Sequence, residues 1–255
     1  MKITALASGS SGNCFYLDSG KGAILIDAGI STKRIVERMD ALRLKPESVK
    51  GIFITHEHGD HTKGADVFAR TFNVPIYATN GTIASGFLCS NEEMINSIKP
   101  GETVKIAGME VEAFLKSHKA EEPVSFTISN GKRISVITDL GFACDRVNEA
   151  ISDSDFLFLE SNHDLKMLEH GPYPYFLKNW VKGDSGHLSN RQASLAVLEH
   201  SNKKLRNVVL SHLSSTNNTP RVALKTFNQM LRERSDFRAK VDVSTRDEPT
   251  KLFRI

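Results

Sequence analysis

Short runs of apolar and β-branched residues alternate along the chain with longer segments of helical period. The runs have the length of strands, and several end at Gly, Asn-Gly or Pro, as strands usually do. They lie at residues 3–7, 14–17, 23–27, 51–55, 75–78, 109–116, 124–129, 133–138, 156–160, 207–211 and 239–243. Asn130-Gly131 lies between two of them and is a strong two-residue signal for a β-hairpin.

Three segments carry the periodicity and the end signals of helices. They are residues 32–44, 188–200 and 219–233. In the second, Ser189 is followed three residues later by Gln192, the sequence of a capping box. In the third, Thr219 precedes Pro220, which places proline at the first helical position.

The order of these elements is strands, helix, strand, helix and strands, repeated loosely in the second half. This order predicts an α/β fold in which two mixed β-sheets pack face to face with helices outside, an αββα sandwich. We expect one domain over residues 1–255. A doubly wound single sheet is the alternative, and the hairpin-like character of residues 1–27 and 103–138 disfavours it.

The composition indicates the class of protein but not its function. With 40% hydrophobic and 25% charged residues, the chain is expected to fold rather than stay disordered. A net charge of +3 suits an anionic substrate but is far below what would demand a nucleic-acid partner.

The cysteines and the hydropathy indicate a cellular compartment. Cys14, Cys89 and Cys144 are far apart and form no CxxC pair, which suits a reducing cytosol and offers no thiolate metal site. We see no signal peptide, and no apolar run approaches the roughly 20 residues of a membrane span. We therefore expect a cytoplasmic protein without a membrane partner, whose oligomeric state the sequence leaves open.

A dense group of metal-ligand residue types follows the predicted strand at 51–55. The stretch ITHEHGDHT places His56, His58, Asp60 and His61 within six positions. His nitrogens and carboxylate oxygens bind first-row metal ions, and Gly59 allows a sharp turn between the two pairs. The alternative is a polar loop in which Asp60 caps a helix.

Acids and histidines also follow four other predicted strands. Asp27, His118, Asp139 and His212 each stand at or just beyond the downstream end of a run. Sites in open α/β sheets gather where strands end, because the loops there share one crevice. Each residue alone is more often a cap or a structural histidine, but together they indicate a site.

These motifs resemble the metallo-β-lactamase superfamily over essentially the whole chain. ITHEHGDHTKG is preceded by LIDAG and followed by SHKA, ITDLG and SHLS, in the order of the family. The resemblance implies the αββα fold and two divalent metal ions, with zinc or manganese expected and iron also suitable. It implies these metal ligands: His56, His58 and His118 for the first ion, Asp60, His61 and His212 for the second, and Asp139 as the bridge. Asp27 would orient a ligand histidine.

The implied chemistry is hydrolysis. Two ions about 3.5–4 Å apart hold a water, lower its pKa and stabilise charge on the attacked group. Asp139 and Asp60 would position this metal-bridging water or hydroxide as the nucleophile. Redox members of the superfamily carry Glu in place of His58. Lactamases with a cysteine ligand carry that cysteine in place of Asp139. Both classes are therefore disfavoured.

Further stretches resemble the compact YycJ (WalJ-like) group of exonucleases and phosphodiesterases. They are ASGSSGNCFYL, ESNHD, GHLSN and SHLSSTNNTP. The resemblance implies a phosphodiester substrate, most simply DNA degraded from 5′ to 3′, with a role in DNA repair. The alternatives are a hydrolase of a small cyclic phosphodiester or thioester, and a slow metal-dependent regulatory or binding protein.

GHLSN admits two interpretations. Ser189 and Asn190 begin a helix, and His187 is adjacent to that start. Alternatively, a phosphate rests on the helix N-terminus, where free N–H groups favour anions, and His187 donates to it or protonates the leaving alkoxide as a catalytic residue. In ESNHD, His163 either contacts substrate or ends a strand.

Two remaining features are also ambiguous. The loop at residues 7–14 lacks the Lys of a P-loop, so it is either a tight turn or a rim loop that touches substrate through Ser10, Ser11 or Asn13. The neighbourhood of GHLSN holds one aromatic and several basic residues, which either bind a single strand or are ordinary surface. They are Trp180, Lys178, Lys182 and Arg191.

Overall fold

The computed structural model describes residues 1–255 and divides them into two compact units. The first unit comprises Met1–Leu115, Ala120–Gly131 and Arg246–Ile255, and the second comprises 116–119 and 132–245. Neither unit is a continuous stretch of chain, and the expectation of a single domain stays a prediction. No helix in the chain is both long and apolar enough to span a membrane.

The first unit is built on a mixed seven-stranded sheet. Its strand order is β14-β1-β2-β3-β4-β5-β6. The bounds are Phe253–Arg254, Lys2–Ala7, Cys14–Asp18, Ala23–Ile26, Val49–Phe53, Ile76–Thr79 and Ile95–Ile98. The strands from β14 to β3 pair antiparallel, and those from β3 to β6 pair parallel.

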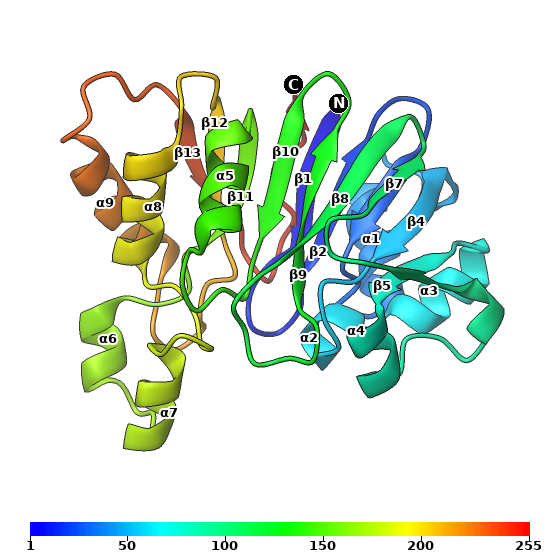
Figure 1. The fold of residues 1–255 in the computed structure, drawn as a ribbon, viewed down its shortest axis with the longest axis horizontal. Coiled ribbons are helices and arrows are strands. Elements are labelled where there is room, and N and C mark those ends of the chain that lie inside the picture. The colour runs from blue at the N-terminus through cyan, green and yellow to red at the C-terminus, as the bar shows by residue number, and fades with distance from the viewer. The chain divides into compact units, whose positions relative to one another are not determined.

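Both faces of this sheet are covered within the first unit. On one face, Ile35 of α1 (Thr32–Ala41) and Phe68 of α3 (Ala65–Phe72) join the same core as Leu25 and Ile52 (Figure 1). On the other face, Phe53 packs against Phe126 of β9 (Val124–Ser129), with ring centroids 5.6 Å apart. Strand β9 pairs antiparallel with β8 (Met109–Leu115), and β8 pairs with β7 (Thr103–Ile106).

The second unit contains four parallel strands in the order β10-β11-β12-β13. Their bounds are Arg133–Ile137, Phe156–Glu160, Asn207–Ser211 and Lys240–Val243. Every residue of β11 is buried, as expected where a parallel strand is covered on both faces. Helices α5 (Asp145–Asp153), α8 (Asn190–His200) and α9 (Pro220–Leu231) lie together beside these strands (Figure 1).

A separate helix pair, α6 (Leu165–His170) and α7 (Tyr175–Val181), lies beyond the downstream ends of these strands (Figure 1). It follows directly from the chain, because β11 ends at Glu160 and α6 begins five residues later. This pair was not predicted, since helices of six and seven residues are too short to show a clear period.

The predicted strands all overlap observed strands, and two of the three helices begin where their end signals place them. Ser189 and Gln192 form the expected capping box on α8, and Thr219 caps α9 with Pro220 in the first turn. The first helix is shorter than predicted: α1 ends at Ala41, and Arg43 adopts a left-handed conformation with φ 57°. The helices α2 (Gly59–Thr62), α3, α4 (Asn80–Ser85) and α5 were missed, as were the edge strands β6, β7 and β14.

Three strand-end residues share an unusual backbone conformation. Asp27, Asp139 and His212 have φ values of 60°, 56° and 54°. Residues other than glycine rarely adopt this left-handed region, and Asp, Asn and His tolerate it better than most. Each strand therefore ends in a sharp turn on a residue whose side chain is of a type that can bind a metal ion or orient a metal ligand, which is a pattern of functional sites.

Two loops of the first unit meet by backbone contact beside α2. The Asn13 N–H donates to the Asp60 carbonyl at 2.9 Å, and the Gly29 N–H donates to the Asn13 carbonyl at 2.7 Å. A Cβ on Gly29 would lie 1.6 Å from the Asp60 carbonyl oxygen. The glycine is thus required by a close approach of three chain segments.

We expect Gly29→Ala to lower the free energy of unfolding by about 3 kcal/mol or more, because the added methyl group must separate these segments. Gly59→Ala is the matched control, since nothing lies within 4 Å of a Cβ built there. That control should stay within about 0.5 kcal/mol of the wild type. Urea unfolding followed by circular dichroism measures both, and equal midpoints for the two variants would contradict the steric account.

Candidate metal centre

The first unit gathers four of the predicted ligands around one short helix. His58 lies immediately before α2, and Asp60 and His61 lie within it. The Nε2 atom of His56 is 3.0 Å from Nδ1 of His58, and Nε2 of His61 is 3.5 Å from the nearer Asp60 oxygen. The rings of His56 and His61 are also adjacent, with centroids 4.1 Å apart. The crowded stretch therefore forms one cluster and not a simple polar loop.

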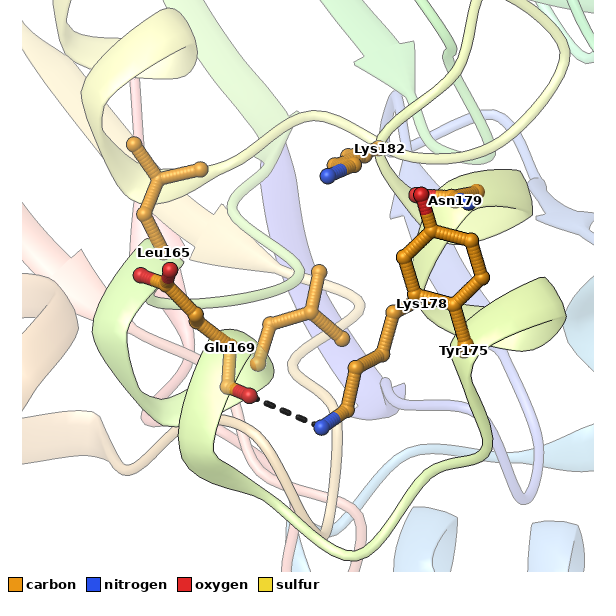
Figure 2. Close-up of a pocket in the computed structure, with 7 residues that line it drawn as sticks. Leu165, Glu169, Tyr175, Lys178, Asn179 and Lys182 are labelled. Atoms are coloured by element: carbon orange, nitrogen blue, oxygen red, sulfur yellow. Dashed lines mark hydrogen bonds between the residues drawn. The ribbon is translucent and has the colours of Figure 1, made fainter.

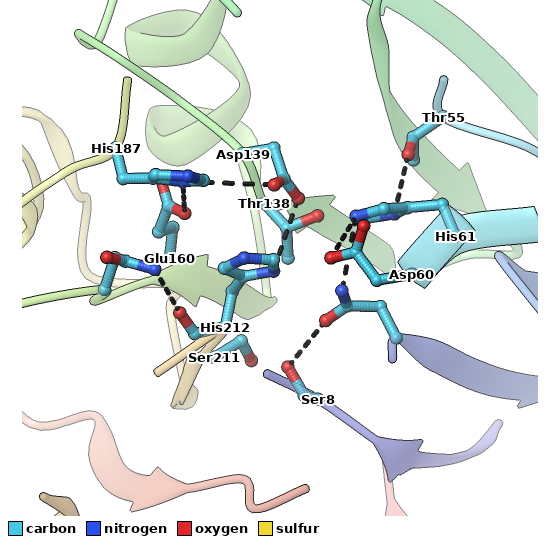
Figure 3. A network of polar contacts seen from close by, with 12 residues as sticks. Ser8, Thr55, Asp60, His61, Thr138, Asp139, Glu160, His187, Ser211 and His212 are labelled. Atoms are coloured by element: carbon cyan, nitrogen blue, oxygen red, sulfur yellow. Dashed lines mark hydrogen bonds and ion pairs between the residues drawn. The ribbon is translucent and has the colours of Figure 1, made fainter. Parts of the chain in front are cut away.

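The carboxylate of Asp27 holds this cluster in place through hydrogen bonds to Thr55 and His61. It is fully buried and accepts three hydrogen bonds: from the Thr55 N–H at 2.8 Å, from the Thr55 hydroxyl at 3.0 Å and from Nδ1 of His61 at 2.7 Å. Because Nδ1–H of His61 donates to Asp27, the lone pair of that ring is on Nε2. This is the geometry expected of a residue that orients a ligand histidine. Figure 3 shows the contact of Thr55 with His61 and the approach of Asp60.

Asn13 lies beneath the same cluster. Its side chain is fully buried, its carbonyl oxygen accepts the Gly9 N–H at 3.1 Å, and its Nδ2 is 3.3 Å from Nε2 of His61. Ser10 and Ser11 are exposed at the tip of the same loop. The loop at residues 7–14 is thus a tight turn that also supports the ligand loop, and substrate contact by Asn13 stays a prediction.

The second unit gathers the other predicted ligands around Asp139, and Figure 3 shows His212 beside it. Nδ1 of His212 is 3.3 Å from one Asp139 oxygen, and Nε2 of His118 is 3.9 Å from the other. Nδ1 of His118 lies 3.3 Å from the Gly186 carbonyl, so it carries the proton and leaves the lone pair on Nε2. Burial lowers the pKa of His118 to about 3, which keeps this imidazole neutral at physiological pH, as a metal ligand must be.

His187 and Glu160 form a second pair beside Asp139. Nδ1 of His187 is 2.8 Å from Oε1 of Glu160, and Oε2 of Glu160 accepts the N–H groups of Leu140 at 2.7 Å and Leu188 at 3.1 Å. Burial would raise the pKa of Glu160, but the charge and the hydrogen bond of His187 outweigh it and hold this pKa below its ordinary value. Glu160 is therefore an ionised partner that fixes the ring of His187.

The donors of each unit fit a divalent cation. All are imidazole nitrogens or carboxylate oxygens, the set that suits zinc, manganese or iron. Two nitrogens bound to one tetrahedral zinc ion lie about 3.3 Å apart, and those of His56 and His58 are 3.0 Å apart. In the second unit, one ligand atom from each of Asp139, Glu160, His187 and His212 lies within 4.8 Å of the others. Both oxygens of Glu160 already accept hydrogen bonds, so it is better suited to hold His187 than to bind the ion.

The residues suggested for substrate contact in the second unit are all buried. Ser189 caps α8, and the Asn190 side chain bonds to Ser161 at 2.6 Å and to Asn218. His163 is fully buried, and neither ring nitrogen has a hydrogen-bond partner. Their observed roles are structural, and direct contact with substrate stays a prediction for each.

Sequence reasoning missed one functional candidate and misjudged another residue. Glu160 ends the strand β11, so the rule that selected acids at strand ends would have selected it too. In ITHEHGDHT, Glu57 matches no ligand position, which predicts a surface residue, but it is half-buried and accepts the Glu121 N–H at 3.0 Å. No signal in the sequence connects residues 57 and 121, because only the fold brings them together.

We expect Asp27→Asn to weaken metal binding by about 10- to 100-fold, because an amide nitrogen facing Nδ1 of His61 reverses the tautomer that the carboxylate fixes. Competition titration against a coloured chelator measures the affinity for Zn²⁺ and Mn²⁺. Asp40→Asn on the exposed face of α1 is the matched control and should bind as the wild type does. Equal affinity in the two variants would show that Asp27 does not orient a ligand.

Burial also lowers the pKa of His163, to about 4. The ordinary pKa of histidine is near 6.5, so between pH 6.5 and 4 this residue binds a proton in the unfolded chain but not in the folded protein. The stability due to neutral His163 is complete above pH 6.5 and is lost as the pH falls toward 4, at up to about 1.4 kcal/mol per pH unit.

We therefore expect His163→Gln to have a shallower fall in unfolding free energy between pH 6.5 and 4.5 than the wild type. Urea unfolding in the presence of a chelator, at several pH values, gives this slope independently of any packing defect. The control His200→Gln removes a histidine that is partly exposed at the end of α8 and should keep the wild-type slope. An unchanged slope in His163→Gln would mean that this ring is protonated in the folded state.

Comparisons with known proteins agree with this chemistry. Residues 23–213 match the β-lactamase superfamily domain. The exodeoxyribonuclease YycJ of Bacillus anthracis is 34% identical over 240 residues, which cover 92% of this chain and 90% of that protein. The exodeoxyribonuclease WalJ of Streptococcus pneumoniae is 34% identical over 254 residues, with 96% and 93% covered.

A solved structure shares the fold across the whole chain. The metallo-β-lactamase fold protein YhfI of Bacillus subtilis superposes with a TM-score of 0.73 at 13% identity, covering 98% of each chain. This confirms the predicted αββα class of mixed β-sheets flanked by helices, and it disfavours a doubly wound single sheet. The chain belongs to the metallo-β-lactamase superfamily, resembles its YycJ and WalJ members, and is a metal-dependent hydrolase.

Proposed function

We propose that this protein is a dinuclear metal-dependent phosphodiesterase that degrades DNA from the 5′ end. The observation that carries the proposal is the 34% identity, over more than nine-tenths of the chain, to two proteins named exodeoxyribonucleases. The ligand sets of the two units supply the chemistry, and the substrate and the polarity come from the resemblance. Members of one superfamily fold can differ in substrate, so an assay must decide both.

The proposed ligand assignment is the one that the superfamily resemblance implies. His56, His58 and His118 would bind one ion. Asp60, His61 and His212 would bind the other, with Asp139 shared by both. In support, hydrogen bonds fix two of these histidines in the tautomer that a ligand needs, because Nδ1 of His61 donates to Asp27 and Nδ1 of His118 donates to the Gly186 carbonyl.

Bound divalent ions would lower the pKa of water and neutralise the charge of the phosphodiester. The chain's own groups position the reactants. Asp60 is only partly buried, and its carboxylate can accept a hydrogen bond from the attacking water, which orients a lone pair toward phosphorus. As the new oxygen–phosphorus bond forms, the bond from phosphorus to the leaving alkoxide breaks, and that alkoxide requires a proton.

His187 is suited to supply this proton. Its Nδ1 is held by ionised Glu160, so Nε2 is the nitrogen available to a substrate oxygen. The neighbouring carboxylate stabilises the protonated imidazole, as in other carboxylate–histidine pairs. The ring can therefore donate from Nε2 to a phosphate oxygen before the reaction and to the leaving oxygen during it.

The proposal is tested with purified protein whose metal content has been measured. We expect digestion of DNA labelled at either end to require Mn²⁺ or Zn²⁺, to stop in chelator and to resume on addition of metal. Asp139→Ala should lower kcat/KM at least about a hundredfold, because removal of a ligand costs more than loss of the group that orients one. His187→Ala should lower kcat about 10²- to 10⁴-fold at unchanged metal content.

Asp153→Ala, which removes a half-exposed acid of the same unit, is the control and should keep wild-type activity. A cyclic dinucleotide and a thioester are assayed in parallel. Turnover of either one without DNA cleavage would replace the proposed substrate. Full metal occupancy with no turnover of any substrate would instead identify a binding or regulatory protein. Wild-type cleavage by Asp139→Ala would refute the shared-ligand assignment.

A further inference from the structure

Helix α7 of the second unit presents two neighbouring aromatic rings to solvent. Tyr175 is 80% exposed and Phe176 is 73% exposed, more than any other large hydrophobic side chain of the protein. Rings of this size usually contribute to a core, and adjacent exposed ones mark a binding surface. The two rings begin helix α7. Lys178 lies within the same helix, and Lys182 caps its C-terminal end.

A cavity of about 480 Å³ lies between α6 and α7 beside these rings. Leu165 and Leu168 give it an apolar wall, and the remaining lining residues are Glu169, Tyr175, Lys178, Asn179 and Lys182. In Figure 2 the Tyr175 ring and the two lysine side chains face this space. An apolar wall with an aromatic ring, an amide and two ammonium groups matches a nucleobase joined to a phosphate.

The charges in this segment favour an anion. Residues 165–182 contain three lysines and one acid, Glu169. The Glu169 carboxylate lies beside Leu165, whereas its backbone carbonyl accepts a hydrogen bond from Nζ of Lys178 at 2.8 Å (Figure 2). An ammonium group has three donors, so Lys178 fixes α7 to α6 and can still donate to a phosphate.

The same helix also packs against the proposed proton donor. Trp180 of α7 meets the ring of His187 edge to face, with centroids 5.5 Å apart, and the Val181 carbonyl accepts the His187 N–H at 2.8 Å. A chain bound along α7 therefore continues toward His187 within one unit of the protein. This contact joins the exposed aromatic surface to the chemistry of the site.

We propose that α6 and α7 bind single-stranded DNA and guide it to His187, with bases stacked on Tyr175 and Phe176 and phosphates on Lys178 and Lys182. A single strand is required because paired bases in a duplex already stack on each other and do not offer their faces to a protein ring. The inference rests on the proposed function and adds to it where the substrate strand lies.

The test measures binding apart from catalysis. A fluorescein-labelled 12-nucleotide oligothymidylate is titrated with full-length protein in chelator, and anisotropy gives the Kd. Tyr175→Ala and Phe176→Ala should each weaken binding about tenfold, the effect of losing one stacked base. Tyr175→Phe keeps the ring and should restore binding. Lys182→Gln should reduce the slope of log Kd against log salt by about 0.7, the value for one phosphate contact with a single strand.

Matched controls are Phe87→Ala, which removes a 70% exposed ring of the first unit, and Lys33→Gln, which removes an exposed charge of α1. Both should bind and cleave as the wild type does. The inference is overturned if Tyr175→Ala and Phe176→Ala bind with wild-type affinity, or if the wild type prefers a duplex of equal length. If the wild type binds the strand through these residues but never cleaves DNA, the proposed function fails and the binding surface stands.

Discussion

The buried carboxylate of Asp27 is the constraint on which the ligand loop of the first unit depends. A carboxylate with no exposure to water is costly unless hydrogen bonds satisfy it. Here the Thr55 N–H, the Thr55 hydroxyl and Nδ1 of His61 all do so. These bonds join the end of β3 to both ends of the segment from Thr55 to His61. The backbone must therefore turn sharply within this segment, and the histidines that it carries are gathered on one side.

Left-handed residues at strand ends also turn the backbone sharply in the second unit. Asp139 and His212 leave β10 and β12 with nearly the same φ as Asp27. A strand that continued in the extended conformation would place successive side chains on opposite faces of the sheet. A single left-handed residue ends the strand and aims its own side chain past the edge. The strain is small for Asp and His, so these residues provide both the turn and the functional group.

The fold could be read from the sequence where local signals are strong. The capping box of Ser189 and Gln192, the Thr219-Pro220 start and the β-branched strand runs each act within a few residues, so their positions were predicted well. The candidate ligand positions could be selected for a similar reason, because each follows a recognisable strand. The helices α6 and α7 were not, since they are shorter than two full turns and their stability comes from contacts such as Lys178 to Glu169.

The hydrogen-bond partners that lie far apart in the chain could not be predicted from the sequence either. Asn190 and His163 were considered as substrate contacts because of their places in GHLSN and ESNHD, but the fold buries both. Asn190 joins Ser161 and Asn218 across segments about 28 residues distant in the chain. Glu57 likewise holds the Glu121 backbone. Whether a polar side chain is buried depends on contacts with residues distant in the sequence, and the neighbouring residues do not indicate those contacts.

The two carboxylate–histidine pairs show how one arrangement serves different ends. Asp27 holds Nδ1 of His61, and Glu160 holds Nδ1 of His187, at 2.7 and 2.8 Å. His61 is fully buried, and a neutral ring there is suited to give its Nε2 lone pair to a cation. His187 is partly exposed, and its charge is the main force that lowers the pKa of Glu160 against burial. Under the proposed function, the same hydrogen bond would support a metal ligand where water is excluded and a proton donor where substrate can reach the ring.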